Sequence, residues 1–130
     1  MSRNQLTVEA LKGFISNQPS KNLRWDILSQ NTSINMDFVL SNIDKPWDWR
    51  MLSQNSGITL ADIMKNNKLP WDWNYVSRNP SITMTDVIDH PELVWDFYRL
   101  SQNPGISFKD ATDNPDYDWD WASISNKPIK

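Results

Sequence analysis

Large apolar side chains recur in this sequence at a fixed spacing of 24 residues. Tryptophan leads the pattern, and an aliphatic residue, a serine, an asparagine and an isoleucine follow it in a constant register. The members of these series are Trp47, Trp71, Trp95 and Trp119; Trp25, Trp49, Trp73, Phe97 and Trp121; Leu28, Leu52, Val76, Leu100 and Ile124; Ser29, Ser53, Ser77, Ser101 and Ser125; Asn31, Asn55, Asn79 and Asn103; and Ile34, Ile58, Ile82 and Ile106. A period of about 20 to 50 residues is typical of stacked repeat arrays. The pattern therefore predicts a core formed by the interfaces between neighbouring repeats, without one central cluster.

Polar residues beside these apolar positions predict a short helix at the start of each repeat. Asp48 is a suitable N-cap, because its carboxylate accepts hydrogen bonds from the free N–H groups of the first helical turn and suits the positive end of the helix dipole. Trp47, before the cap, and Leu52, the fourth helical residue, have the spacing of a hydrophobic staple. Asn55 is expected to end the helix in the left-handed conformation that asparagine tolerates, with its side chain bonded to a neighbouring repeat. Asp72, Asp96 and Asp120 repeat the cap signal.

A second helix is predicted in the other half of each repeat. Thr59 is an N-cap residue, and Asp62 follows three residues later, which is the spacing of a capping box with Asp in place of Glu. The same pairs recur as Thr83 with Asp86 and Ser107 with Asp110, and the expected helix ends are Asn66, His90 and Asn114. Helices about two turns long are unstable alone in water, so packing between neighbours must hold them.

These signals divide the chain into a terminal segment and a set of repeats. Residues 1–22 are expected to form an N-terminal capping helix and a linker, and the repeats span 23–46, 47–70, 71–94, 95–118 and, in part, 119–130. The predicted fold class is all-α, a right-handed α-solenoid of about five two-helix repeats with modified terminal helices. A leucine-rich repeat is the alternative, since Leu52-Ser53-Gln54-Asn55 resembles part of its motif. The two N-cap signals in each unit favour helices.

Composition and charge exclude several kinds of function. The chain has 13 basic and 16 acidic residues and a net charge of −3, so it has no overall attraction to nucleic acid or anionic membranes. It has no cysteine, which excludes disulfides, zinc–thiolate sites and thiol catalysis. No apolar run approaches the roughly 20 residues of a membrane span, and the start of the sequence lacks the apolar region of a secretory signal. We therefore expect an intracellular protein.

The repeat has a distinctive signature in Asp44-Lys45-Pro46-Trp47-Asp48-Trp49, Leu52-Ser53-Gln54-Asn55 and Asn79-Pro80-Ser81-Ile82-Thr83. Over residues 23–127, the chain resembles the Pro-Trp-Asp-Trp tandem repeats of proteins encoded by large DNA viruses. That family has no established activity. The resemblance implies a viral source, a location in the host cytoplasm or the virion, and a binding or scaffold role, and it supplies no catalytic residues. The sequence departs from the family pattern at Val94, Phe97, Asp118 and Lys127.

The recurring polar residues have structural explanations that compete with catalysis. No recurring His or Lys accompanies the serines as a base, and a hydrogen bond to a carbonyl of their own helix accounts for them. His90, the one histidine, stands where other repeats have Asn, and the acidic segment 113–118 lacks the pattern of a calcium loop. The tryptophans fit a stacking platform for bases or sugars, but their fixed register with the caps favours burial. We predict no enzymatic activity, no cofactor and no metal site.

Positions that differ between repeats are the ones that packing does not dictate. On the predicted first helices they form a mildly basic, polar and aromatic surface, which we call the first-helix stripe; the variable positions of the second helices are more acidic. The stripe consists of Arg50, Gln54, Asn74, Tyr75, Arg78, Tyr98, Arg99 and Gln102. Variable side chains on a repeated scaffold are typical of solenoids that bind extended partners. We therefore predict a monomeric scaffold that binds a protein partner through this stripe and does not bind membranes.

Two other functions fit the same sequence. A helical repeat protein can bind single-stranded nucleic acid at one nucleotide per repeat, although the acidic balance disfavours this. The chain also fits a structural component of a virion or another assembly, whose terminal repeats stack end to end. An ordinary solvated surface accounts for the stripe about as well as a binding role does.

Overall fold

The computed structural model describes Glu9 and residues 23–129. Residues 23–129 form nine short helices, which begin about every 12 residues, and contain no strand. The helices are α2 (Trp25–Leu28), α3 (Met36–Ser41), α4 (Trp49–Ser53), α5 (Leu60–Lys65), α6 (Trp73–Val76), α7 (Met84–Asp89), α8 (Phe97–Gln102), α9 (Phe108–Asp113) and α10 (Trp121–Ser125). The all-helical prediction is confirmed for this part of the chain, and the leucine-rich alternative, which needs a strand in each repeat, is wrong there. The capping helix predicted within residues 1–22 falls almost wholly outside the described residues.

Aspartate side chains cap three of the first helices, α4, α6 and α8, as predicted. Oδ1 of Asp48 accepts hydrogen bonds from two N–H groups in the first turn of α4, at 3.1 and 3.2 Å. Asp72 caps α6 with two such bonds, and Asp96 caps α8 with one, from the N–H of Arg99. Asp120 differs, because its carboxylate accepts a hydrogen bond from the hydroxyl of Ser123 at 2.6 Å and bonds no backbone N–H of α10.

Capping boxes begin three of the second helices. The hydroxyl of Thr59 accepts from the N–H of Asp62 at 3.2 Å, and the carboxylate of Asp62 accepts from the N–H of Thr59 at 3.0 Å. The same box stands before α7 and α9. Before α3, Phe38 takes the place of the acid, and Asn35 caps the helix with its side-chain oxygen alone. The expected ends of α5, α7 and α9 at Asn66, His90 and Asn114 are confirmed.

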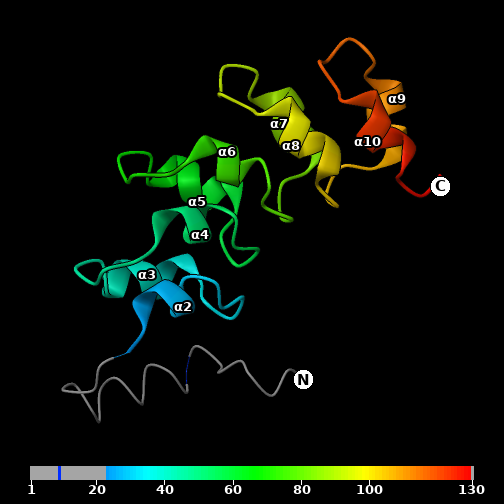
Figure 1. Cartoon of the computed structure of the whole chain (residues 1–130). Helices are drawn as coiled ribbons and strands as arrows, with labels where there is room; N and C mark the ends of the chain where they lie inside the picture. Colours follow the sequence, from blue (N-terminus) through cyan, green and yellow to red (C-terminus); the bar gives the residue numbers. More distant parts are fainter. Residues whose placement is uncertain (1–8, 10–22, 130) are drawn as a thin grey trace.

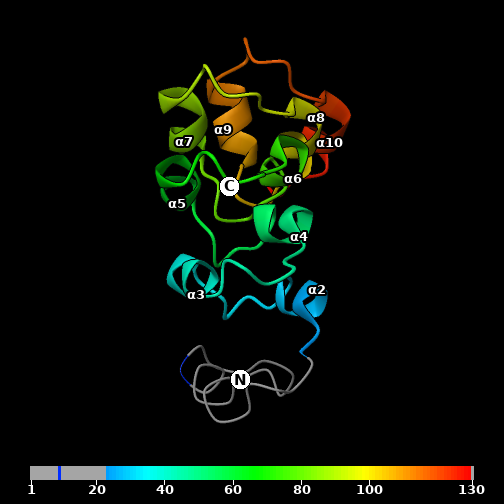
Figure 2. The same cartoon turned by 90° about the vertical axis from the view of Figure 1, so that its left-hand side faces the viewer.

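The helices form two rows. In Figure 2, α2, α4, α6, α8 and α10 lie on one side of the molecule, whereas α3, α5 and α7 lie on the other, and α9 lies between them in this view. Figure 1 shows that successive helix pairs follow one another in chain order along an arc. Equivalent helices of adjacent repeats lie against one another, as α4 does against α6 and α8 against α10.

The core runs through the repeats as a continuous line of apolar side chains. Ile34, Ile58, Ile82 and Ile106 are each at most 1% exposed, and the aliphatic residues of α4, α6, α8 and α10 in the 24-residue register are fully buried. Because helices of four to six residues are not stable alone, burial along this line holds them in place. Among the described residues, none of the helices is both long and apolar enough to span a bilayer.

Candidate functional site

The buried serines of the first helices join neighbouring repeats. Oγ of Ser53 donates to the carbonyl of Trp49 at 2.6 Å, which is the predicted bond within the helix. The same oxygen accepts the N–H of Asp72, 19 residues further on, at 3.0 Å. Ser29, Ser77 and Ser101 make both bonds as well. Each of these hydroxyls therefore bonds its own helix and the backbone of the next repeat, and the second bond was not predicted.

The buried asparagines join each repeat to the one before it. The two N–H groups on Nδ2 of Asn79 are shared among the carbonyls of Ser53, Asn55 and Ile58, at 3.0, 2.8 and 2.9 Å. Asn55 and Asn103 likewise bond carbonyls 26 and 24 residues earlier. The predicted bonds between repeats are confirmed, but the left-handed backbone is wrong, since no non-glycine residue in the described part of the chain has a positive φ. The reason is that the side chain satisfies helix-terminal carbonyls in the preceding repeat, a role that needs no left-handed backbone.

Tryptophan side chains fill the joints between repeats. Nε1 of Trp71 donates to the carbonyl of Asn66 at 2.9 Å. Its ring meets that of Trp49, from the preceding repeat, edge to face with centroids 5.2 Å apart, an arrangement favoured by the ring quadrupoles. The equivalent pairs are Trp25 with Trp47, Trp73 with Trp95 and Phe97 with Trp119. Trp121 makes no such pair among the described residues and is 44% exposed, so only the last of these aromatic positions has an open face.

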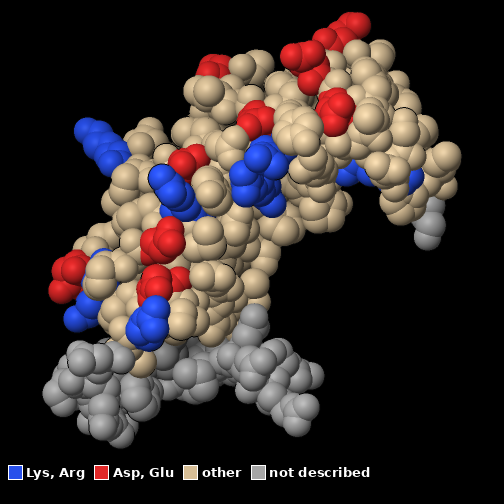
Figure 3. Space-filling model, in the orientation of Figure 1, with Lys and Arg blue, Asp and Glu red and all other residues tan. Residues whose placement is uncertain are grey.

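The first-helix stripe lies on α4, α6 and α8, with Gln54 directly after α4 and Arg78 two residues after α6. None of its eight members is buried; the side chain of Arg50 is 69% exposed. Its members are therefore more accessible than the buried serines and asparagines of the same repeats, whose side chains bond adjacent repeats. Figure 3 shows basic and acidic side chains interspersed along one face of the array, so the surface offers paired charges and hydrogen-bonding groups without one dominant sign.

The centre of the stripe is a linked polar and aromatic cluster around α6. The guanidinium of Arg78 lies 4.4 Å from the ring centroid of Tyr75, and its Nη2 donates to Oδ1 of Asn74 at 3.1 Å. Nδ2 of Asn74 donates in turn to the carboxylate of Asp96 in the next repeat. The Nε of Arg78 is buried and has no hydrogen-bond partner among the described residues. A buried donor without an acceptor is unfavourable, so this atom makes the cluster costlier to hold and does not itself face a partner.

The rest of the stripe forms smaller groups. Arg99 lies over the ring of Tyr98 at 5.2 Å from the centroid. Nε of Arg50 is 3.9 Å from the carboxylate of Asp72, a separation that contributes little on an exposed surface. Gln54 donates to the sulfur of Met51 at 3.5 Å. Gln102 is exposed and lines a groove beside α10. The structure thus brings the α6 members together and leaves the members on α4 and α8 as separate groups.

Ionisable groups in the described part of the chain form no cluster of three that could hold a metal ion. Nδ1 of His90 lies 3.3 Å from the carboxylate of Glu92 on an exposed turn. The pKa of Glu92 is lowered, first by a hydrogen bond from its own backbone N–H and then by the histidine.

Comparison with protein-family models, curated proteins and solved structures finds no match for the chain. The resemblance to viral Pro-Trp-Asp-Trp repeats stays a prediction.

Sequence reasoning missed the groove beside α10. Its two decisive residues are Ser123, which occupies the position of Met51, Tyr75 and Arg99 in earlier repeats, and Lys127, which occupies the position of the buried asparagines. The replacement of Asn by Lys was visible in the sequence as a departure from the pattern. The groove that the small Ser123 leaves could not be predicted from the sequence, because the space around a side chain is known only once its neighbours are placed.

Proposed function

We propose that the chain is a right-handed α-solenoid of about five two-helix repeats that acts as a non-enzymatic scaffold. Its first-helix stripe binds a protein partner. The partly exposed cluster of Asn74, Tyr75 and Arg78 is the observation that carries this proposal. Arg and Tyr are the residue types that contribute most to protein interfaces, because each combines a large apolar surface with directed hydrogen bonds.

The side chains that join the repeats are different from those that vary on the surface, which supports the same function. Serine and asparagine at the repeated positions are buried and bond adjacent repeats, as Ser53 and Asn79 do, so they have little freedom to vary. Stripe residues make only a few polar contacts between repeats, such as that of Asn74 with Asp96, and their identity changes from α4 to α6 to α8. A periodic scaffold with changing exposed side chains presents an extended surface, and a partner that follows the array would meet a different set of groups at each repeat.

The experiment is affinity capture from expressing cells, with and without nuclease, using two charge-matched triple variants. Arg50→Glu, Arg78→Glu and Arg99→Glu together reverse the cations of the stripe. Lys65→Glu, Lys68→Glu and Lys109→Glu together make the same change of net charge elsewhere, at positions that are all exposed. We expect nuclease-resistant protein partners to be lost from the first variant and retained by the second, with both variants helical by circular dichroism. Retention of every partner by the arginine variant would remove the stripe as the binding surface.

End-to-end assembly is a second candidate function, favoured by the open face of α10. Trp121 and Ser125 are the last members of series whose earlier members contact the next repeat, and in the described chain both are exposed. A second copy or another repeat protein that supplies a Trp-Asp segment would meet the same aromatic edge and the same hydroxyl. Sedimentation velocity over a wide concentration range tests this: a mass that rises with concentration and returns to the monomer value in Trp121→Ala supports assembly, and a constant monomer mass contradicts it.

A further inference from the structure

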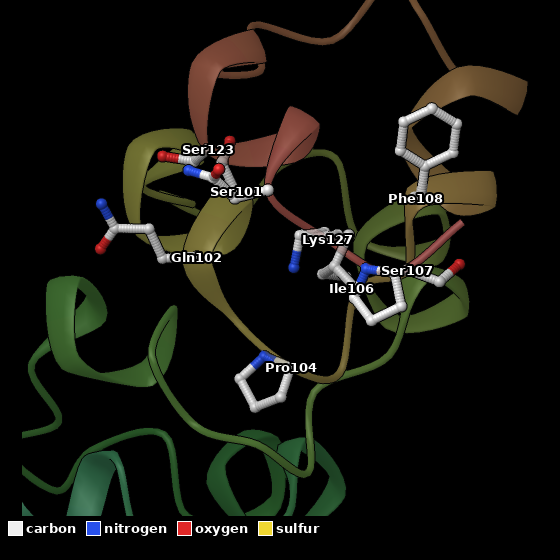
Figure 4. A pocket seen from close by; sticks show the side chains of 10 residues that line it. Ser101, Gln102, Pro104, Ile106, Ser107, Phe108, Ser123 and Lys127 are labelled. Carbon is white, nitrogen blue, oxygen red and sulfur yellow. The ribbon is translucent and has the colours of Figure 1, made fainter. Parts of the chain in front are cut away.

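A groove of about 690 Å³ lies beside α10, between the α8–α9 connection and the segment that follows α10. Figure 4 shows its walls: Gln102 and Pro104 on one side, Phe108 on the other, and Ser123 and Lys127 between them. Its volume falls in the range of about 300–1,000 Å³ that is usual for ligand sites. Apolar rings and a few convergent polar groups form its lining, which is the composition expected of such a site.

The same groove occurs three repeats earlier in a filled form. There the lining includes Gln30, Met51 and Asn55, the counterparts of Gln102, Ser123 and Lys127, and the volume is about 210 Å³. In the two intervening repeats, Tyr75 and Arg99 stand at the position of Met51. Only the last repeat has a side chain as small as serine there. The groove beside α10 is larger for two reasons: Ser123 is small, and the described chain has no following repeat to cover the groove as Pro80 does at the earlier one.

Lys127 gives this open groove a positive charge. Its Nζ donates to the carbonyl of Asn103 at 2.8 Å, 24 residues earlier, as the buried asparagines do. An ammonium group has three N–H donors, and this is the only hydrogen bond that it makes to the described residues, so two donors remain. In Figure 4 the nitrogen points into the space between Gln102 and Pro104. Burial lowers the pKa of Lys127, and the charge of Asp110 offsets part of this effect. The ammonium group is therefore incompletely hydrated and is not fully compensated by a carboxylate.

The charge of the groove contrasts with that of the whole molecule. Its lining contains no Asp or Glu, although the chain has a net charge of −3. A carboxylate can bond a lysine amine with a strong, charge-assisted hydrogen bond. A phosphate is usually held by several converging donors or a guanidinium fork, and here a single ammonium stands beside proline and phenylalanine rings. The lining thus favours a carboxylate with an apolar neighbour over a phosphate.

We propose that this groove binds an extended peptide, with an acidic group of the peptide against Lys127 and apolar side chains on either side of it, over Pro104 and over Phe108. The amide of Gln102 and the hydroxyls at the rim supply hydrogen bonds to the peptide backbone. Gln102 also belongs to the first-helix stripe, so the groove continues that surface toward α10. The proposal nevertheless depends on Ser123 and Lys127, which the stripe does not include, and it stands or falls separately from the function proposed for the stripe.

Two variants are matched to the repeat itself and should fold. Lys127→Asn restores the residue of the earlier repeats, and an amide there can bond the carbonyl of Asn103 as Asn79 bonds that of Asn55. This variant keeps the structural bond and removes the charge. Ser123→Met restores the side chain that fills the groove near Met51 and leaves the lysine in place. Lys65→Asn makes the same lysine substitution at an exposed position of α5 and serves as the control.

The test is selection of a random peptide display library on the full chain, followed by titration of the enriched peptides against the variants. We expect the enriched peptides to share an Asp, a Glu or a free C-terminal carboxylate next to an apolar residue. Replacing that carboxylate by its amide, Lys127→Asn and Ser123→Met should each weaken binding by about tenfold or more, as expected for loss of a charge-assisted bond or of the site. Lys65→Asn should leave binding unchanged.

The proposal is overturned if selection on the full chain enriches peptides no more than selection on Ser123→Met does. It is also overturned if the enriched peptides show no excess of acidic groups, or if Lys127→Asn binds them as tightly as the parent chain. Acetate and butyrate are titrated as small carboxylates, and binding of these with the affinity of the selected peptides would show a small-molecule site and contradict a peptide site. Because Arg50→Glu, Arg78→Glu and Arg99→Glu lie outside the groove, loss of stripe partners in that variant with retained peptide binding separates the two proposals.

Discussion

Replacement of Asn79 by alanine tests the physical basis of the array. This side chain is fully buried and donates to three carbonyls of the preceding repeat. Its own oxygen accepts from the N–H and hydroxyl of Ser81. Alanine removes the whole network and leaves the carbonyl of Ser53, at the end of α4, without this donor. Each buried polar group left unsatisfied costs about 1–3 kcal/mol, so the expected loss of stability is about 4 kcal/mol after some entry of water.

Three further variants grade this expectation. Asn55 and Asn103 each bond two carbonyls, so their alanine variants should lose about 2–3 kcal/mol. Asn67 is exposed, and its alanine variant should change stability by no more than about 0.5 kcal/mol. The measurement is the free energy of unfolding from equilibrium urea titrations. Far-UV circular dichroism and tryptophan fluorescence are followed together, since repeat arrays need not unfold in one step.

Substitution of Asn79 by aspartate adds a pH test. Aspartate has nearly the same shape but presents acceptors to the three carbonyls, and burial would raise its pKa above the unfolded value. The native state would then bind a proton more tightly than the unfolded state, so the stability of Asn79→Asp relative to the parent should improve as the pH falls toward 4. The reasoning is refuted if Asn79→Ala is as stable as Asn67→Ala, or if the aspartate variant shows no such trend.

Four other substitutions probe three separate features. Ser77→Ala removes an acceptor for the next repeat and should cost about 1–2 kcal/mol, whereas Ser125→Ala, whose hydroxyl bonds only its own helix among the described residues, should cost less than half as much in the same urea assay. Gly57→Ala should lower the thermal midpoint clearly, because a Cβ would lie 2.0 Å from the carbonyl oxygen of Ile34; an unchanged midpoint would show that the backbones can separate without cost. Lys127→Asn should raise stability by about 1 kcal/mol at neutral pH. Since burial lowers the pKa of Lys127 in the native state, protonation opposes folding below that pKa, and the advantage of the asparagine variant should shrink as the pH rises toward the unfolded value of 10.5.

Local features of the fold could be predicted from the sequence because they depend on spacings within one helix. Asp48 caps α4, and Thr59 with Asp62 forms a capping box; both follow from residues two or three positions apart. The bond from Ser53 to the carbonyl of Trp49 spans four residues and was predicted for the same reason. Asp120 shows the limit of this approach: a hydroxyl at Ser123, within the same turn, competes successfully for its carboxylate.

The sequence predicts that neighbouring repeats pack together, but not which atoms meet between them. The period indicates that neighbours pack, but not that the Oγ of Ser53 meets the N–H of Asp72 or that the rings of Trp49 and Trp71 meet edge to face. These contacts depend on how one helix pair is rotated against the next, which a single sequence does not specify. The candidate site was harder still, because the stripe was identified from variation alone. Its central cluster uses Asp96, a residue already assigned as a cap in the next repeat.

The hydrogen bonds between repeats explain why structure and recognition can be separated in this chain. A buried hydroxyl such as that of Ser53 donates within its helix and accepts from the following repeat, and Asn79 returns bonds to the preceding one. Each such residue bonds a neighbouring repeat on one side, so the free energy lost on its replacement depends on whether that repeat is present. The smaller destabilisation expected for Ser125→Ala than for Ser77→Ala follows from this. The exposed stripe residues, such as Arg50 and Tyr98, lie outside these bonds. Their replacement should therefore change binding while leaving the urea midpoint within the scatter of exposed-site variants, and a stripe whose charge reversal unfolded the array would be part of the scaffold rather than a surface carried by it.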